Sequence, residues 1–271
     1  MGDFSDYMYK IIRSYEQNHP NIQIKWVDVP FSEGEKRTLA AVMTDNPPDL
    51  INLNPDFSAL LAQKGTLEEI DETAVSDFNP EIIKALKYND KLYSIPWYAT
   101  SAITIYNKDL FQQSGIIRLP KTYKELSTIS EKVKENTGAY AYLPTITEND
   151  FSVMNFVIPL RAKHKKEALD FCLYLTNEQN QLELAKMTNV IATNSNALKD
   201  NFYNDDSTLE AKARSISARQ INKITPQLKQ KRGQKEINTL VNSAVQSALL
   251  NKDSIENILN KLSRDIGGLE E

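Results

Sequence analysis

The sequence predicts an α/β protein in which a mostly parallel sheet is flanked by helices and followed by a mainly helical C-terminal part. Helical and extended apolar patterns alternate before Lys163, and nearly every pattern after it is helical. With 271 residues, 41% hydrophobic and 25% charged, the chain has an ordinary globular composition and is long enough for a sizeable core. Alternation favours parallel pairing, because parallel neighbours need a crossover connection, usually a helix.

The first predicted helix carries apolar side chains at helical spacing, with Ser5 as its N-cap. These side chains are Tyr7, Met8, Ile11, Ile12 and Tyr15. Residues 22–26 alternate with period two, which predicts a strand that places Trp26 in the core. Ser32 and Glu35 have the spacing of a capping box and predict the start of a second helix.

Further apolar runs predict strands at residues 50–53, 92–95, 103–106, 139–143 and 154–158. Helices are predicted at residues 56–64, after Asn79-Pro80, and from the capping box of Thr122 and Glu125 to about Gly138. Beyond Lys163, apolar stripes predict helices around residues 168–175, 182–185, 237–249 and 255–262.

The sequence lacks the residue patterns that several classes of function require. The net charge is −4 with mixed signs, so no basic face predicts binding to nucleic acid. His19 and His164 lie at predicted helix boundaries, and the single cysteine, Cys172, falls on an apolar helix face where a buried thiol is expected. The eight glycines form no phosphate-binding pattern, and no metal-ligand spacing occurs. We therefore expect no enzyme activity, no cofactor and no metal.

The sequence also bears on location. No apolar stretch approaches the roughly 20 residues that span a bilayer. The residues after Met1 lead directly into an amphipathic segment and do not form a signal peptide. Either a cytoplasmic protein or a trimmed, mature-like start fits this pattern.

A series of short motifs follows in a characteristic order. They are the segments 15–22, 46–50 (Asn-Pro-Pro-Asp-Leu), 52–57, 65–71, 91–98, 106–111 (Tyr-Asn-Lys-Asp-Leu-Phe), 119–123 and 152–181. Together they resemble the extracytoplasmic sugar-binding proteins of ABC importers, the group that contains maltose-binding protein. One departure is Asp90, which stands where the family usually has glycine.

The resemblance implies a two-lobed fold of the periplasmic-binding-protein type. Lobe one is expected from residues 1–107 and 151–200, and a reduced, mainly helical lobe two from residues 108–150 and 201–271. The family's first strand and much of its second lobe have no counterpart here, so the chain is expected to be an incomplete copy. Family members close their lobes about a hinge, here expected near Asn107-Lys108, near Asp150-Phe151 and near residue 200.

The resemblance and the chemistry of sugars together indicate candidate ligand contacts. Sugar hydroxyls need hydrogen-bond partners, and the apolar face of a sugar ring stacks on an aromatic plane. Asp56 aligns with a carboxylate that binds sugar hydroxyls in the family, the alternative being a helix N-cap after Pro55. Trp97 and Tyr98 are expected to stack on the sugar, with core or hinge packing as the alternative.

Four further polar residues complete the predicted site. Asn54 is expected to orient Asp56 or to contact the ligand. Thr100 and Ser101 lie where relatives place polar contacts near the crossover between lobes. Asp3, at the start of the first helix, matches a polar binding loop of the family.

The resemblance therefore implies a monomeric, extracytoplasmic receptor that binds a mono- or oligosaccharide in an interlobe cleft and delivers it to the permease subunits of an ABC transporter. Two alternatives stay open. One is a truncated remnant of the same ancestry that acts as a protein-interaction module. The other is a carbohydrate-active enzyme, for which no catalytic pair of carboxylates is identifiable.

Overall fold

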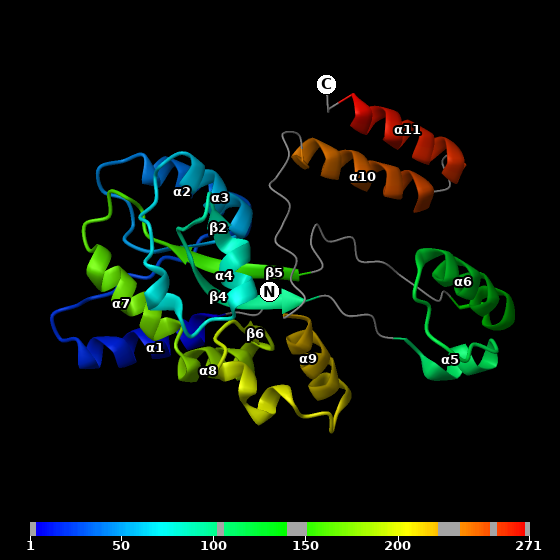
Figure 1. Cartoon of the computed structure of the whole chain (residues 1–271), viewed down its shortest axis with the longest axis horizontal. Coiled ribbons are helices and arrows are strands. Elements are labelled where there is room, and N and C mark those ends of the chain that lie inside the picture. The colour runs from blue at the N-terminus through cyan, green and yellow to red at the C-terminus, as the bar shows by residue number, and fades with distance from the viewer. Residues whose placement is uncertain (1–3, 102–105, 140–150, 222–233, 250–253, 269–271) are drawn as a thin grey trace. The chain divides into compact units, whose positions relative to one another are not determined.

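The structure, a computed structural model, describes residues 4–101, 106–139, 151–221, 234–249 and 254–268 (Figure 1). The chain divides into two compact units. Unit 1 comprises Met1–Ala102 and Asp150–Gln234, and unit 2 comprises Ile103–Asn149 and Lys235–Glu271. Residues 201–234, expected in the second lobe, thus belong to unit 1.

Unit 1 contains a four-stranded sheet of order β1-β5-β4-β6. Its strands are β1 (Ile51–Leu53), β4 (Ile95–Ser101), β5 (Phe151–Val157) and β6 (Ile191–Ala192). All three pairings are antiparallel, so the predicted mostly parallel sheet is wrong for the described strands. β5 pairs with both β1 and β4, which makes β1 and β4 parallel to each other without being neighbours.

Helices cover both faces of this sheet, as the prediction of an α/β fold requires (Figure 1). On one face α1 (Ser5–Asn18), α7 (Lys165–Leu175) and α8 (Glu178–Thr188) pack against one another. On the other lie α2 (Phe31–Val42) and α3 (Pro55–Gln63). The remaining helical elements of unit 1 are η1 (Glu72–Val75), α4 (Pro80–Leu86), η2 (Ala197–Lys199), η3 (Asn201–Tyr203) and α9 (Leu209–Gln220).

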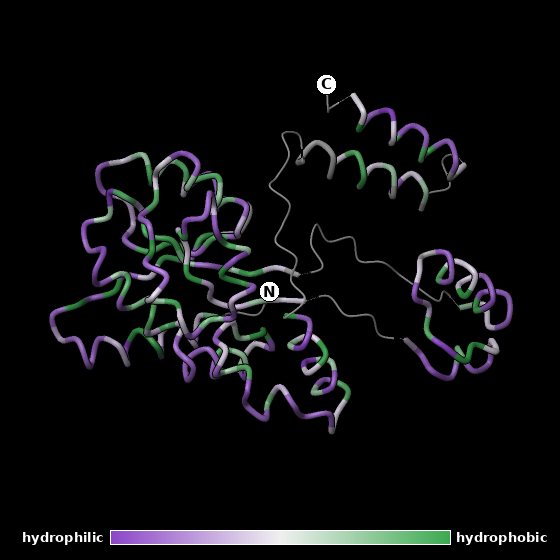
Figure 2. Tube along the Cα trace, viewed as in Figure 1, coloured by the Kyte–Doolittle hydropathy of each residue, from purple (hydrophilic) through white to green (hydrophobic). Residues whose placement is uncertain are grey.

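Two apolar cores follow from this layering. Along β5, Phe156 joins the larger core with α1, α7 and α8, whereas Val157 joins the smaller core with Phe57 and Leu61 of α3. This alternation is the period-two geometry of a strand buried on both faces. Figure 2 accordingly shows hydrophobic residues concentrated toward the centre of unit 1 and hydrophilic ones more frequent at its periphery.

Several predicted helix ends are confirmed. Asn79 caps α4, and Thr122 caps α6 (Tyr123–Thr137), which ends at Gly138 with φ 70°. Two N-caps are displaced. α1 is preceded by Phe4, so Ser5 is its first helical residue. α2 begins at Phe31 after Pro30, and the predicted Ser32 cap is therefore wrong.

The hairpin of β2 (Lys87–Tyr88) and β3 (Lys91–Leu92) explains the residue that departs from the family motif. Asn89 and Asp90 both have positive φ, 50° and 61°. A two-residue hairpin of this kind needs left-handed backbone at both positions, which glycine, asparagine and aspartate tolerate best. Asp90 can therefore replace the usual glycine.

The predicted strand at residues 22–26 has no assigned secondary structure and pairs with no described strand. Ile22, Ile24 and Trp26 are partly buried against the larger core, which accounts for the alternating pattern. The backbone N–H of Ile24 donates to the Glu16 carboxylate at 2.7 Å instead of to a ladder partner. Most of the strands predicted at 103–106 and 139–143 lies outside the described residues.

The described elements of unit 2 are all helical: α5 (Lys108–Gln113), α6, α10 (Gln234–Leu249) and α11 (Ile255–Gly267). α5 and α6 pack against each other, and each carries one buried apolar side chain, Phe111 and Val133. Among the described residues of both units, no helix combines the length and apolar character that crossing a bilayer demands.

Candidate functional site

The first part of the candidate site lies where β1 passes into α3. Asn54 has extended backbone (φ −77°, ψ 158°), and its side-chain oxygen accepts the N–H of Phe57 at 2.8 Å. Its amide nitrogen donates to Glu35 of α2 at 3.2 Å. Asn54, and not Asp56, is therefore the N-cap, and Asp56 is a half-buried acid in the first turn of α3. A negative charge is favourable in this turn because it faces the positive end of the helix dipole.

The second part lies at the end of β4. Thr100 is exposed and stands opposite Ser152 of β5. Ser101, the last residue of β4, donates its hydroxyl hydrogen to Gln220 of α9. Gln220 thus belongs to the surroundings of the site, although no sequence motif indicated it.

The strand register directs these two parts toward the same end of the sheet. β1 and β4 run in the same direction, but β4 ends opposite Phe151, the first residue of β5, whereas β1 ends opposite Asn155. Leu53 is level with Asn155 and Tyr98 with Met154, which places Asn54 at about the level of Tyr98. Ser101 lies three residues farther along, or about 10 Å, and β1 and β4 are two strand spacings, again about 10 Å, apart.

We call Asn54, Asp56, Thr100 and Ser101 the strand-end rim. These side chains include one carboxylate, one amide and two hydroxyls, a set of donors and acceptors suited to a ligand rich in hydroxyl groups. No cluster of three or more possible metal ligands occurs among the described residues.

Trp97 and Tyr98 differ from the expectation of a stacking platform. Only 5% of Trp97 and 3% of Tyr98 is exposed, and both rings contact Phe4, with centroid distances of 5.7 and 5.5 Å. Trp97 also packs on Phe156 at 4.8 Å. Burial raises the pKa of Tyr98 to about 12. Neither ring presents a face to solvent, so this correction favours the alternative of core packing.

A β-bulge explains why sequence alternation misleads here. The pairing of β4 with β5 shifts between Pro96 and Tyr98, which leaves Trp97 as an extra residue. A bulge of this kind re-aims side chains locally. Two consecutive rings can then both reach Phe4, where a regular strand would send them to opposite faces.

Asp3, the remaining predicted contact, lies outside the described residues. Two surface hollows of the described structure are lined by residues outside the strand-end rim. One, of about 480 Å³, is bordered by exposed residues of α1 from Asp6 to Gln17. The other, of about 470 Å³, lies in unit 2 beside α6.

Comparison with known proteins identifies the family. The sequence profile of the bacterial extracellular solute-binding proteins matches residues 2–146, more than half of the chain. The chain belongs to this family. The resemblance found in the sequence is thereby confirmed, and the family is one of solute-binding proteins, not of enzymes.

Curated relatives match over part of their length. A mannitol-binding protein from Pseudomonas aeruginosa is 30% identical over 141 residues, which cover 49% of this chain and 32% of that protein. A diacetylchitobiose-binding protein from Streptomyces coelicolor is 28% identical over 105 residues, covering 36% of this chain and 25% of that protein. The matched stretch thus spans a quarter to a third of these relatives.

Solved structures share the fold over nearly the whole chain. An ABC transporter solute-binding protein from Thermotoga lettingae, bound with α-D-tagatose, aligns with a TM-score of 0.67 at 14% identity, covering 97% of this chain and 95% of that chain. UgpB from Mycobacterium tuberculosis, in complex with glycerophosphocholine, aligns with a TM-score of 0.71 at 15% identity, covering 97% and 96%. These likenesses confirm the α/β, periplasmic-binding-protein-like fold.

Proposed function

We propose that this solute-binding protein binds a carbohydrate or a sugar alcohol at the strand-end rim and delivers it to the permease of an ABC importer. The observation that supports the proposal is the shared direction of β1 and β4, because Asp56 follows the end of one strand and Thr100 and Ser101 lie at the end of the other. A ligand with several neighbouring hydroxyls can use such donors and acceptors together.

The family and its members support the choice of ligand. By their names, two relatives bind mannitol and diacetylchitobiose, both of which carry several hydroxyl groups. Delivery to a permease rests on a neighbour of the same fold that is named as an ABC transporter solute-binding protein. The description of the family as extracellular supports an extracytoplasmic location.

The proposal is tested by calorimetric titration and thermal unfolding of the chain with mannitol, diacetylchitobiose and maltotriose. A ligand at one hundred times its Kd stabilises the folded state by about 2.7 kcal/mol, which raises the melting temperature measurably. If none of the three binds or shifts the melting temperature, a role in sugar capture is refuted. A stable oligomer in light scattering together with that result would favour the protein-interaction alternative.

A matched pair of variants locates the ligand. Asp56→Asn removes the charge at the strand-end rim and is expected to weaken binding by about tenfold or more, as for loss of a hydrogen bond to a charged group. The control is Glu81→Gln. Glu81 is the first-turn acid of α4, which also has an asparagine N-cap, Asn79, followed by a proline. Equal effects of the two substitutions would contradict binding at the rim.

A further inference from the structure

The hollow beside α6 in unit 2 is a second concave site, and it shares no residue with the strand-end rim. We call it the α6 hollow; its volume is about 470 Å³. The loop from Gly115 to Pro120 forms one side and the exposed face of α6 the other. Its apolar walls are Ile116, Ile117, Leu119, Pro120 and Ile129.

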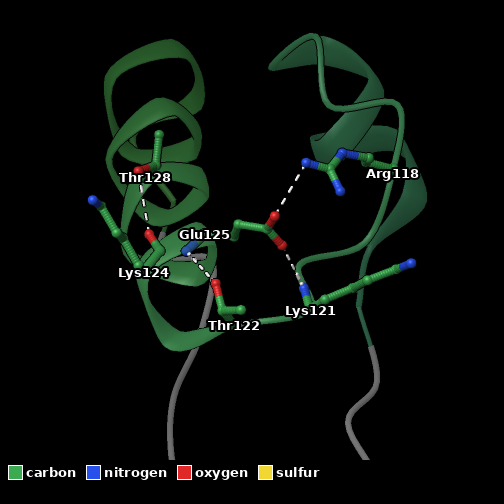
Figure 3. A network of polar contacts seen from close by, with 6 residues as sticks. All are labelled: Arg118, Lys121, Thr122, Lys124, Glu125 and Thr128. Carbon is green, nitrogen blue, oxygen red and sulfur yellow. Dashed lines mark hydrogen bonds and ion pairs between the residues drawn. The ribbon is translucent and has the colours of Figure 1, made fainter.

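Glu125 holds the loop in place (Figure 3). Its carboxylate points from α6 toward the loop. It accepts hydrogen bonds from the Arg118 guanidinium at 3.1 Å and from the backbone N–H of Lys121 at 2.7 Å. Thr122 closes the turn by accepting the N–H of Glu125 at 3.2 Å. At the other end of the loop, the N–H of Ile116 donates to the Phe111 carbonyl at 2.9 Å. Such preorganisation lowers the entropy that a binding partner must offset.

The fixed loop presents apolar side chains to solvent. Ile117 is 98% exposed and Leu119 is 49% exposed. Val133 of α6 is fully buried, whereas the hollow is bordered by Lys124, Glu125, Thr128, Ile129 and Lys132 of this helix. Single exposed apolar residues are common on proteins. Here two lie on one rigid loop that borders a hollow, which is the arrangement of an anchor pocket in a protein interface.

The charge around the hollow is complementary to an acidic partner. Its lining contains the cations Arg118, Lys124 and Lys132 and one carboxylate, Glu125. Arg118 already neutralises Glu125. In the part of the chain that the structure describes, neither Lys124 nor Lys132 forms an ion pair. Complementary charges steer association and set register, and they favour carboxylates here.

We propose that the α6 hollow binds a polypeptide segment of another protein, one that inserts an apolar side chain between Ile117 and Ile129 and places Asp or Glu beside Lys124 and Lys132. A concave site with apolar walls receives a side chain, whereas a bilayer surface is contacted by a flat or convex apolar face. The proposal is independent of sugar binding at unit 1.

The test uses fluorescence anisotropy of two labelled amphipathic peptides of about 15 residues with the same leucine face. One carries Glu at its flanking positions and the other carries Lys. We expect the acidic peptide to bind the intact chain at least tenfold more tightly and to lose affinity as ionic strength rises. Equal binding of the two peptides, or no binding of either, would overturn the proposal.

Variants connect the binding to the hollow. Ile117→Ser is expected to weaken binding of the acidic peptide by about tenfold, because the contact with the inserted apolar side chain loses apolar area. Lys124→Glu combined with Lys132→Glu should abolish the preference for the acidic peptide. Leu209→Ser, which changes a 63% exposed leucine of α9, is the control and should leave binding unchanged. Circular dichroism checks that each variant is folded.

A further arm distinguishes a membrane surface. Phosphatidylglycerol vesicles and phosphatidylcholine vesicles are sedimented with the intact chain and with Ile117→Ser. The proposal of a protein partner is refuted if the intact chain sediments with phosphatidylglycerol vesicles, Ile117→Ser does not, and the acidic peptide does not bind. The loop then contacts anionic lipid.

Discussion

Replacing Gln181 with leucine should strongly destabilise unit 1. Gln181 lies on α8, is 1% exposed, and bridges the helix to the chain after β6. Its side-chain oxygen accepts the N–H groups of Thr193 at 2.6 Å and of Asn194 at 3.0 Å. The Thr193 hydroxyl continues the network to the carbonyl of Trp97 at 3.1 Å, beside the β-bulge.

Leucine is close to glutamine in volume, so Gln181→Leu mainly removes the acceptor. Two buried backbone N–H groups then lack a partner, each at a cost of about 1–3 kcal/mol. The expected loss in the free energy of unfolding is therefore about 4 kcal/mol. Urea denaturation followed by tryptophan fluorescence measures it, since both tryptophans, Trp26 and Trp97, lie in unit 1.

Gln179→Leu is the matched control, because Gln179 is an exposed residue of the same helix. We expect its free energy of unfolding to stay within about 0.5 kcal/mol of the original. If both variants unfold at the same urea concentration with unchanged m-value, the bridge from α8 to β4 does not stabilise the fold, and the reasoning is refuted.

Three further predictions concern single groups. In urea denaturation, Trp97→Ala should lower the free energy of unfolding by about 3–5 kcal/mol. Trp97→Phe should lower it by less than about 1.5 kcal/mol, because Nε1 of Trp97 has no hydrogen-bond partner in the described structure. The backbone N–H of Lys121, and to a smaller extent Arg118, lower the pKa of Glu125. The Glu125 carboxylate therefore stabilises the loop above its unfolded-state pKa, and this stabilisation is lost as pH falls through its folded-state pKa. Hydrogen exchange at the Lys121 amide should become faster over that pH range, and Glu125→Gln should remove this pH dependence. Burial raises the pKa of the Cys172 thiol, so a disulfide reagent should modify it only in denaturant; rapid labelling of the native chain would contradict this.

The features predicted correctly from the sequence are those determined by neighbouring residues. Asn79 and Thr122 are predictable helix starts, because a cap depends only on the residues two or three positions ahead. Gly138 is a predictable helix end, because left-handed backbone favours glycine. The strands at 50–53 and 154–158 followed from short apolar runs, and they correspond to β1 and β5.

The features missed depend on which distant segments become neighbours. Nothing in the alternation of helices and strands indicates that β5 inserts antiparallel between β1 and β4. The bulge at Trp97 exists only relative to the pairing with β5, so the burial of that ring could not be predicted from β4 alone. Glu35 and Gln220 touch the candidate site across 19 and 119 residues of chain, and no local pattern marks such contacts.

The role of Asp56 can be separated from its local chemistry, because unit 1 contains a near repeat of its surroundings. Asn54-Pro55-Asp56 and Asn79-Pro80-Glu81 both begin a helix with an asparagine cap, a proline and an acid in the first turn. The second segment follows Phe78, which bridges Asn194 beyond β6, at the opposite end of β4 from Ser101. The helix dipole favours a negative charge in the first turn of each helix. A difference between Asp56→Asn and Glu81→Gln in ligand affinity must therefore arise from position at the strand-end rim, and not from the start of a helix.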